Sequence, residues 1–322
     1  MKRNNTIGLP SGFRDILFEE ARTRRAIEGS FGEAFAVAGY GEIAPSGVEF
    51  LDVYARGKQS VKDVTFKFLD REDNLLALRA DFTPAIARIV ATGALDGEMP
   101  HRIWYAGSVF RKTDWHRGRF HEFRQIGAEL IGLNSLERDV EILRLAFSCL
   151  ESAGISDVQL HLNHAGIFRG IIGSLGLTGE SLQKVKTEID RKDLRRMTSR
   201  LKSLGVADEV QSQLEAVCRC VGPEGLLRST RKDVLIEESC RAMDDLLELA
   251  ERLPCWKDRL LFDLTEIDEL EYYTGMMFAI FSPRLKSELG KGGRYDALLQ
   301  EFGRSLPAVG FSFSLDGLAE LA

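Results

Sequence analysis

The segment Glu122–Ile131 alternates two kinds of side chain with a period of two, which is the spacing of a β-strand whose faces meet different surroundings. The side chains of one face are apolar: Ile126, Ala128 and Leu130. That face suits packing under helices. The opposite face carries Gln125 and Glu129, and Gly127 between them leaves room for a ligand. The strand therefore predicts a buried sheet with a candidate site for a small polar zwitterion, although a solvent-exposed sheet face would show the same residue types.

Short turns join the other strands predicted in the first part of the chain. Thr65–Leu69 and Leu75–Arg79 form a hairpin around the polar turn Asp70–Asn74, and Ile103–Arg111 precedes the strand described above. Such connections predict an antiparallel sheet with helices on one face, which is an α+β fold.

Two helices are expected beside these strands. Asp15–Ala38 carries apolar residues at helical spacing, and Gly39 marks its end. Thr83 can cap a second helix, which Pro84 starts.

A helical segment interrupts the strand pattern. Residues 178–257 repeat apolar side chains at helical spacing, and strand-like patterns resume from Leu260. We expect residues 1–177 and 258–322 to form one core and residues 178–257 to be a helical insertion. The basic stretch Lys184–Lys202 within it fits a solvated helix face or an RNA-facing patch.

Composition excludes several classes of protein. The 322 residues are 44% apolar and 29% charged with a net charge of −6, which is globular and offers no basic field for nucleic acid. The sequence contains no apolar run long enough for a membrane span and no leader-like start. Five scattered cysteines are typical of a reduced cytoplasm, and no spacing predicts a metal or cofactor site.

Longer motifs carry a family resemblance along nearly the whole chain. They are Pro10–Leu17 (PSGFRDIL), Gly39–Pro45 (GYGEIAP), Leu78–Pro84 (LRADFTP), Phe110–Gly132, Glu271–Gly275 (EYYTG), Gly292–Gly303 and Pro307–Leu318. In this order they resemble the signature segments of class II aminoacyl-tRNA synthetases, and of the histidyl branch in particular. The resemblance implies that family's antiparallel sheet flanked by helices.

The resemblance also implies a histidine pocket. The residues at its binding positions are Asp81, Thr83, Arg111, Gln125, Glu129, Tyr272 and Tyr273. In the family the first two positions hold the amino group, and the arginine meets the ligand carboxylate and the ATP phosphate. The glutamate and a tyrosine, here Glu129 and Tyr273, recognise the imidazole.

Two positions depart from the family pattern. The catalytic arginine of the synthetases falls on Asp268, and the arginine of their third motif falls on Gly317. Activation of an amino acid builds negative charge on the α-phosphate of ATP, so the loss of both guanidinium groups predicts that the chain is not a working synthetase. The sequence also ends where the anticodon-binding domain of the family would begin, so tRNA is not an expected partner.

These features together resemble the regulatory subunits of ATP phosphoribosyltransferase. That family pairs with a short catalytic subunit in the first step of histidine biosynthesis, and it is needed for activity and for feedback inhibition by histidine. The resemblance implies a cytoplasmic hetero-oligomer, self-association near Pro45, and histidine bound in the synthetase-like pocket or at the subunit contact. The alternatives are a stand-alone amino-acid-activating ligase and an RNA-binding module that uses the segment Lys184–Lys202.

Overall fold

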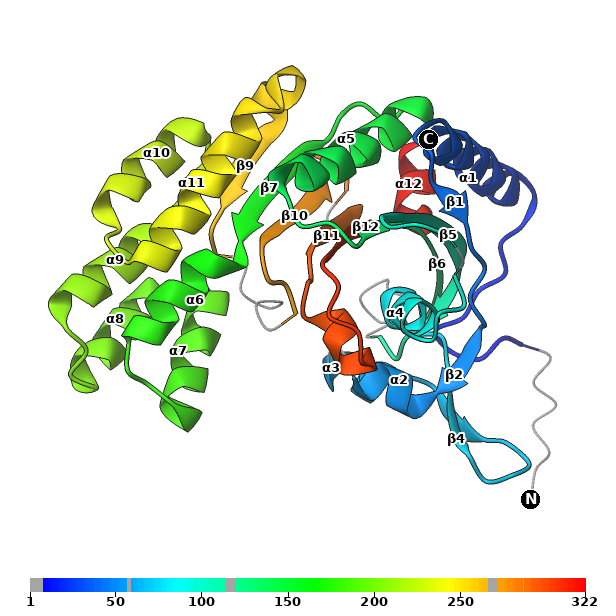
Figure 1. Ribbon diagram of the computed structural model, residues 1–322, viewed down its shortest axis with the longest axis horizontal. Helices are drawn as coiled ribbons and strands as arrows, with labels where there is room; N and C mark the ends of the chain where they lie inside the picture. Colours follow the sequence, from blue (N-terminus) through cyan, green and yellow to red (C-terminus); the bar gives the residue numbers. More distant parts are fainter. Residues whose placement is uncertain (1–7, 57–58, 96, 114–119, 266–271, 286) are drawn as a thin grey trace.

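Nine strands form one mixed sheet in the computed structural model, which describes residues 8–56, 59–95, 97–113, 120–265, 272–285 and 287–322 (Figure 1). Across the sheet the strands follow the order β1 (Gly41–Glu42), β5 (His101–Phe110), β6 (Glu122–Ile131), β12 (Ala308–Ser314), β11 (Gly290–Arg294), β10 (Met276–Phe281), β7 (Gln159–His164), β9 (Leu260–Asp263) and β8 (Val221–Gly222).

The centre of this sheet is antiparallel, as the sequence predicts. Every neighbouring pair from β5 across to β7 is antiparallel, whereas β1 pairs with β5 and β7 pairs with β9 in parallel. Strand β6 has the predicted bounds and lies between β5 and β12. Its Glu129 faces Gly310 in the register of β12.

Three helices cover the apolar face of β6. They are α1 (Phe18–Val37), α5 (Leu136–Ser152) and α12 (Leu315–Leu321), and they share one core cluster with Ile126, Ala128 and Leu130 (Figure 1). Helix α1 begins at Phe18, later than predicted, and ends before Gly39 as expected. Gly39 has a φ of +80°, which only glycine adopts at little cost.

The prediction that helices cover only one face is wrong. Helix α4 (Thr83–Ala91) and the short helix η3 (Leu298–Phe302) pack against the other face, where Phe82 and Ile86 join Ile103 and Tyr105 in a second cluster. The cause is that β5 alternates apolar residues toward this second face as well.

The predicted hairpin exists but belongs to a separate sheet. Strands β3 (Lys67–Leu69) and β4 (Leu75–Leu78) pair as expected, and β2 (Val48–Phe50) joins them on the other side of β4. The Asp70 carboxylate accepts the backbone N–H groups of Glu72 and Asn74, which stabilises the turn. Helices α2 (Leu51–Ala55) and α3 (Gln59–Val64) connect β2 to β3.

The segment that interrupts the strand pattern is helical and lies beyond β7 and β9 in Figure 1. Its elements, with the helix before it, are α6 (Ala165–Ser174), α7 (Gly179–Asp190), α8 (Leu194–Ser203), α9 (Asp208–Cys218), α10 (Glu224–Asp233), α11 (Glu237–Glu251) and the 3₁₀ helix η2 (Pro254–Arg259). Strand β8 departs from the all-helical expectation because it pairs with β9 at the sheet edge. The division into core and insertion remains a prediction.

Two sequence expectations concern the chain as a whole. Among the described residues, no helix combines the length and the apolar character that crossing a bilayer requires. The five cysteines are free thiols, and Cys149, Cys218 and Cys220 are buried.

Candidate functional site

A cavity of about 310 Å³ lies on the side of the sheet that α4 covers. All seven residues assigned to histidine binding line it: Asp81, Thr83, Arg111, Gln125, Glu129, Tyr272 and Tyr273. They come from the start of α4, the end of β5, strand β6 and the segment before β10. The structure thus brings together side chains that are distant in sequence.

Glu129 is the most deeply buried acid of this cavity, with 1% of its surface exposed. Its Oε1 accepts hydrogen bonds from Thr83 Oγ1 at 2.9 Å and from the Tyr105 hydroxyl at 3.2 Å. Its Oε2 is bonded to the Tyr295 hydroxyl. Burial raises the pKa of Glu129 from 4.5 to about 8, since desolvation disfavours the charged form more than these hydrogen bonds favour it.

Thr83 serves this site and does not cap α4. The predicted side-chain cap is absent: helix α4 begins at Thr83 itself, so Phe82 occupies the N-cap position, and the Thr83 hydroxyl donates to Glu129. The backbone N–H of Thr83 is accepted instead by Asp81 Oδ1 at 3.2 Å. The prediction placed the first residue of the helix at Pro84, one residue later than the structure has it.

Arg111 and Asp81 form the charged side of the cavity. Arg111 Nη2 lies 2.9 Å from Asp81 Oδ2, and Arg111 Nε donates to the Ala80 carbonyl at 2.6 Å. About a quarter of each of the two paired side chains is exposed, at 25% and 27%. This pair can present a cation to a carboxylate and an acid to an ammonium at the open side of the cavity.

Gln125 is nearly buried yet incompletely bonded. It is 7% exposed, its Nε2 lies 3.5 Å from Ser312 Oγ, and its Oε1 has no hydrogen-bond partner among the described residues. A buried amide oxygen without a donor is costly, so it favours a ligand that brings an N–H group.

Aromatic rings line the part of the cavity near Glu129. The Tyr272 ring stacks on Tyr295 at 5.5 Å and meets Tyr273 edge-on at 4.9 Å. Tyr105 stacks on Phe82 at 4.3 Å. This part of the cavity suits a planar ring.

Gly127 does not leave room for a ligand, contrary to the interpretation of the sequence. A Cβ atom at Gly127 would lie 2.3 Å from the Phe311 carbonyl oxygen and 2.7 Å from the Tyr105 hydroxyl. The glycine therefore admits strand β12 and a neighbouring tyrosine. The pattern within one strand could not reveal what the adjacent strands place there.

The lining residues that sequence reasoning did not assign to the site include Tyr105, Tyr295 and Ser312. The alternation of β5 places Tyr105 on the same face as Arg111, and this was the one available signal. Tyr295 follows β11 and Ser312 lies in β12; the order β6, β12, β11 in the sheet brings them to this cavity, and no local pattern predicts that order.

A second cavity of about 320 Å³ shares Arg111, Gln125 and Ser312 with the first and extends to Gly317. Gly317 brings no side chain, and a Cβ atom there would meet Leu289 at 3.5 Å. The preceding Asp316 is bonded to Arg14 at 3.0 Å and Arg24 at 2.6 Å. Asp268, the other departure from the synthetase pattern, lies outside the described residues.

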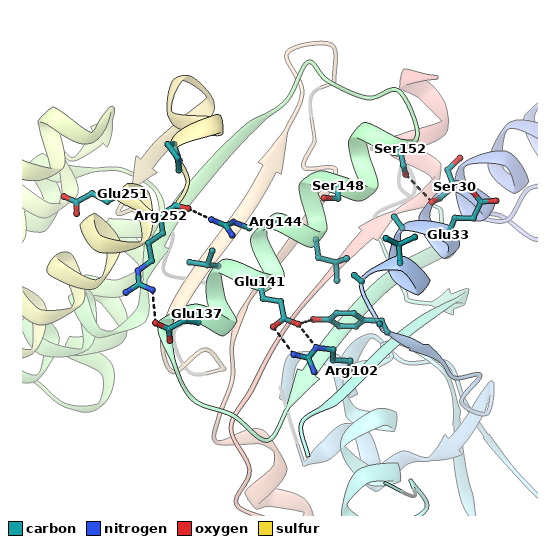
Figure 2. A pocket seen from close by; sticks show the side chains of 18 residues that line it. Ser30, Glu33, Arg102, Glu137, Glu141, Arg144, Ser148, Ser152, Glu251 and Arg252 are labelled. Atoms are coloured by element: carbon teal, nitrogen blue, oxygen red, sulfur yellow. Dashed lines mark hydrogen bonds and ion pairs between the residues drawn. The ribbon is translucent and has the colours of Figure 1, made fainter. Parts of the chain in front are cut away.

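A larger cavity, of about 1190 Å³, lies elsewhere, along the groove between α1 and α5 (Figure 2). Two ion pairs join charged side chains of this groove: Arg102 meets Glu141 at 2.7 Å and Arg252 meets Glu137 at 2.8 Å. It contains none of the seven predicted residues. The Pro45 carbonyl accepts Arg79 Nη1 at 2.8 Å, and a role of Pro45 in self-association stays a prediction.

Comparisons with known proteins agree with this architecture. A family model described as histidyl-tRNA synthetase matches residues 12–318. The ATP phosphoribosyltransferase regulatory subunit of Geobacter metallireducens is 35% identical over 311 residues, which is 95% of this chain and 72% of that protein. The protein of the same name from Carboxydothermus hydrogenoformans is 32% identical over 99% of this chain and 97% of its own length.

Solved structures share the fold. A crystal structure from Bacillus halodurans, described as an ATP phosphoribosyltransferase regulatory subunit/histidyl-tRNA synthetase, has a TM-score of 0.90 at 28% identity and covers 100% of this chain and 84% of that one. Histidyl-tRNA synthetase from Nostoc has a TM-score of 0.81 at 21% identity, over 98% of this chain and 74% of that one, and supports the fold alone.

Proposed function

The chain belongs to the histidyl-tRNA synthetase-like family of ATP phosphoribosyltransferase regulatory subunits, and we propose that a short catalytic subunit requires it for activity and for feedback inhibition by histidine. Both subunits would act in the cytoplasm, in the first step of histidine biosynthesis. The observation that carries the proposal is the convergence of seven histidine-pocket positions on one cavity.

The hydrogen-bond donors and acceptors of the cavity complement each polar group of histidine. Arg111 and Asp81, at the more exposed side, complement the carboxylate and ammonium groups. Gln125 Oε1 needs an N–H donor. The tyrosine rings around Glu129 offer a planar space with acceptors for the imidazole.

A non-catalytic role is supported by what the second cavity lacks. Its Gly317 position supplies no cation, and Asp316 beside it forms ion pairs with Arg14 and Arg24. A preorganised donor to a developing negative charge contributes about 3–4 kcal/mol to a transition state. We propose that this loss, with an aspartate at position 268, has removed adenylate formation.

Feedback inhibition would operate through linkage between subunits. Histidine that binds one quaternary state more tightly than another shifts the assembly toward the first state, and the shift is limited by that difference in affinity. We place the ligand in the cavity around Glu129. A homodimer formed through the segment Gly39–Pro45 would belong to the same assembly.

Reconstitution with a short-form catalytic subunit tests the proposal. The two chains should co-purify, turnover should require this chain, and added histidine should inhibit the complex. Gln125→Ala should weaken inhibition and leave activation intact, since Gln125 lies in the cavity. The control Glu33→Gln, in the groove of Figure 2, should change neither. Turnover without this chain would contradict the proposal, and inhibition unchanged by Gln125→Ala would place histidine at the subunit contact.

Pyrophosphate exchange separates this function from that of a ligase. The purified chain should show no histidine-dependent exchange between pyrophosphate and ATP. Measurable exchange would show that the chain activates an amino acid, and it would end the regulatory interpretation of Gly317.

A further inference from the structure

The carboxyl group of Glu129 has hydrogen-bond donors but no opposite charge. Its partners are the hydroxyls of Thr83, Tyr105 and Tyr295, and none of the ion pairs found in the described part of the chain includes it. Three hydroxyl donors suit an ionised carboxylate, since a neutral carboxyl must turn one of its oxygens into a donor. These partners therefore suit the ionised form of Glu129, but none of them carries the positive charge that would balance it.

Asp139 shows the usual alternative within the same chain. It is buried to a similar degree, but its Oδ1 lies 2.6 Å from Arg294 Nη2. A buried carboxylate needs such a partner or a proton. Without a cationic partner, Glu129 holds a proton at neutral pH, in keeping with the raised pKa.

The other charged or titratable side chains that line the cavity are Asp81, Arg111, Lys112, Tyr272, Tyr273 and Lys291. Asp81, before α4, adds a second negative charge and is bonded to Arg111 after β5. Tyr105 from β5 and Tyr295 after β11 touch Glu129 directly, and burial holds the pKa of both phenols above the ordinary range. The phenols therefore stay neutral, which leaves Glu129 as the group that exchanges a proton.

The orientation of an amino acid in the cavity follows from exposure. Its charged backbone groups can stay partly solvated at the Asp81 and Arg111 side, where about a quarter of each side chain is exposed. Its ring then lies among Tyr272 and Tyr295 and reaches the 1% exposed carboxyl of Glu129.

We propose that Glu129 selects for a basic ring: its carboxyl transfers a proton to a ring nitrogen of the bound amino acid, and the two then face each other as carboxylate and imidazolium. One O–H bond breaks and one N–H bond forms, so the total charge of the complex is unchanged. The ligand supplies the missing counter-charge, and the three hydroxyls keep their acceptor. This inference rests on the proposed function in that histidine occupies this cavity.

The protonation of bound histidine tests the exchange directly. The free imidazole has a pKa of about 6.5 and is mostly neutral at a pH of about 8. Histidine labelled with ¹⁵N in the ring and bound to the full chain should give imidazolium chemical shifts at that pH. The ring should be neutral when bound to Glu129→Gln. Glu122→Gln makes the same charge change on the same strand outside the cavity and should retain the imidazolium.

A second ligand keeps the test independent of any variant. β-(2-Thiazolyl)alanine has nearly the shape of histidine but a ring of far lower basicity, so it should bind the unmodified chain at least about tenfold more weakly, a difference of one power of ten in the dissociation constant. A neutral bound imidazole, or an imidazolium that persists in Glu129→Gln, would overturn the proton transfer and leave histidine binding intact. No bound signal at saturating histidine would overturn both the transfer and the proposed place of the ligand.

Discussion

At the scale of single residues, Gly310 and Glu129 constrain each other across two strands. A Cβ atom at Gly310 would lie 1.5 Å from Glu129 Oε2 and 2.6 Å from the Ala128 carbonyl oxygen. The close approach of β12 to β6 therefore depends on a residue without a side chain.

Gly310→Ala should destabilise the chain by about 1–3 kcal/mol, because the added methyl group must displace the Glu129 carboxyl or strand β12. Urea denaturation measures the difference in free energy of unfolding. Gly29→Ala is the control: no atom lies within 4 Å of a Cβ there, so the change should stabilise helix α1 by about 0.5–1 kcal/mol. A neutral outcome for Gly310→Ala would show that β12 can move away freely.

The titration of Glu129 makes the stability of the ligand-free protein depend on pH. Its pKa is raised from 4.5 to about 8, so its contribution to stability is complete below about 4.5 and is lost as the pH rises through about 8. The urea midpoint should fall between pH of about 5 and about 8.5, and it should fall less in Glu129→Gln. Two other buried groups have shifted pKa values: burial raises the pKa of Asp139 to about 6 and lowers that of His164 to about 4. Both are present in the two chains, so their contributions cancel in the comparison. Parallel curves would show that Glu129 is ionised throughout.

The seven residues that the motifs name one by one all line the same cavity. Gln125 and Glu129 were also accessible from strand alternation alone. Tyr295 was not, because it reaches Glu129 from the end of β11, which is separated from β6 by strand β12. The identity of the ligand stays a prediction, since residue types that suit histidine also occur on solvated sheet faces.

At the scale of elements, Asp316 joins three of them. It lies at the start of α12, it is bonded to Arg14 ahead of α1 and to Arg24 within α1, and it accepts the backbone N–H of Arg124 in β6 at 3.1 Å. The side chains of Asp316 and Arg24 are 16% and 10% exposed. These bonds hold the last helix against the first and fix the edge of the second cavity.

Asp316→Asn should reduce the free energy of unfolding by about 1.5–3 kcal/mol, since it removes charge-assisted hydrogen bonds from two arginines that are mostly buried. Denaturant unfolding checks this value. Glu237→Gln breaks an ion pair with Arg241 whose side chains are 78% and 73% exposed, and it should change little. Equal effects of the two variants would mean that Asp316 does not join α12 to α1.

Helices and strands with a clear periodicity of apolar residues were predictable, but the elements they pair or pack with were not. The strand Glu122–Ile131 has the bounds that alternation indicates, and α1 follows its apolar spacing. The hairpin Thr65–Arg79 formed but joined the smaller sheet, because strand pairing depends on contacts far apart in sequence. Helix α4 was predicted with the wrong cap, because it begins one residue earlier than predicted and so places Phe82 at the N-cap position.

At the scale of the whole molecule, the proposed assembly predicts self-association. Light scattering at micromolar concentration should give the mass of a dimer, by resemblance to a family in which the segment at Gly39–Pro45 lies between two copies. Val37, next to this segment, is 90% exposed, so a charge placed there would lie beside the proposed contact. Val37→Glu should then shift the mass toward the monomer, whereas Leu235→Glu, a similarly exposed site at 77%, should not. A monomer for the unmodified chain would contradict the prediction.

The order of strands in the large sheet has a consequence for how the protein is made. Strand β12 is the last in the described chain, yet it lies between β6 and β11. A ribosome therefore exposes the free edge of β6 for as long as the helices and strands from α5 to β11 are still being synthesised. Unpaired strand edges recruit other chains, so nascent copies on one messenger are exposed to aggregation until their final strand emerges. Chaperones that shield such edges should therefore matter more to the yield of this protein than to that of one whose central strands come first.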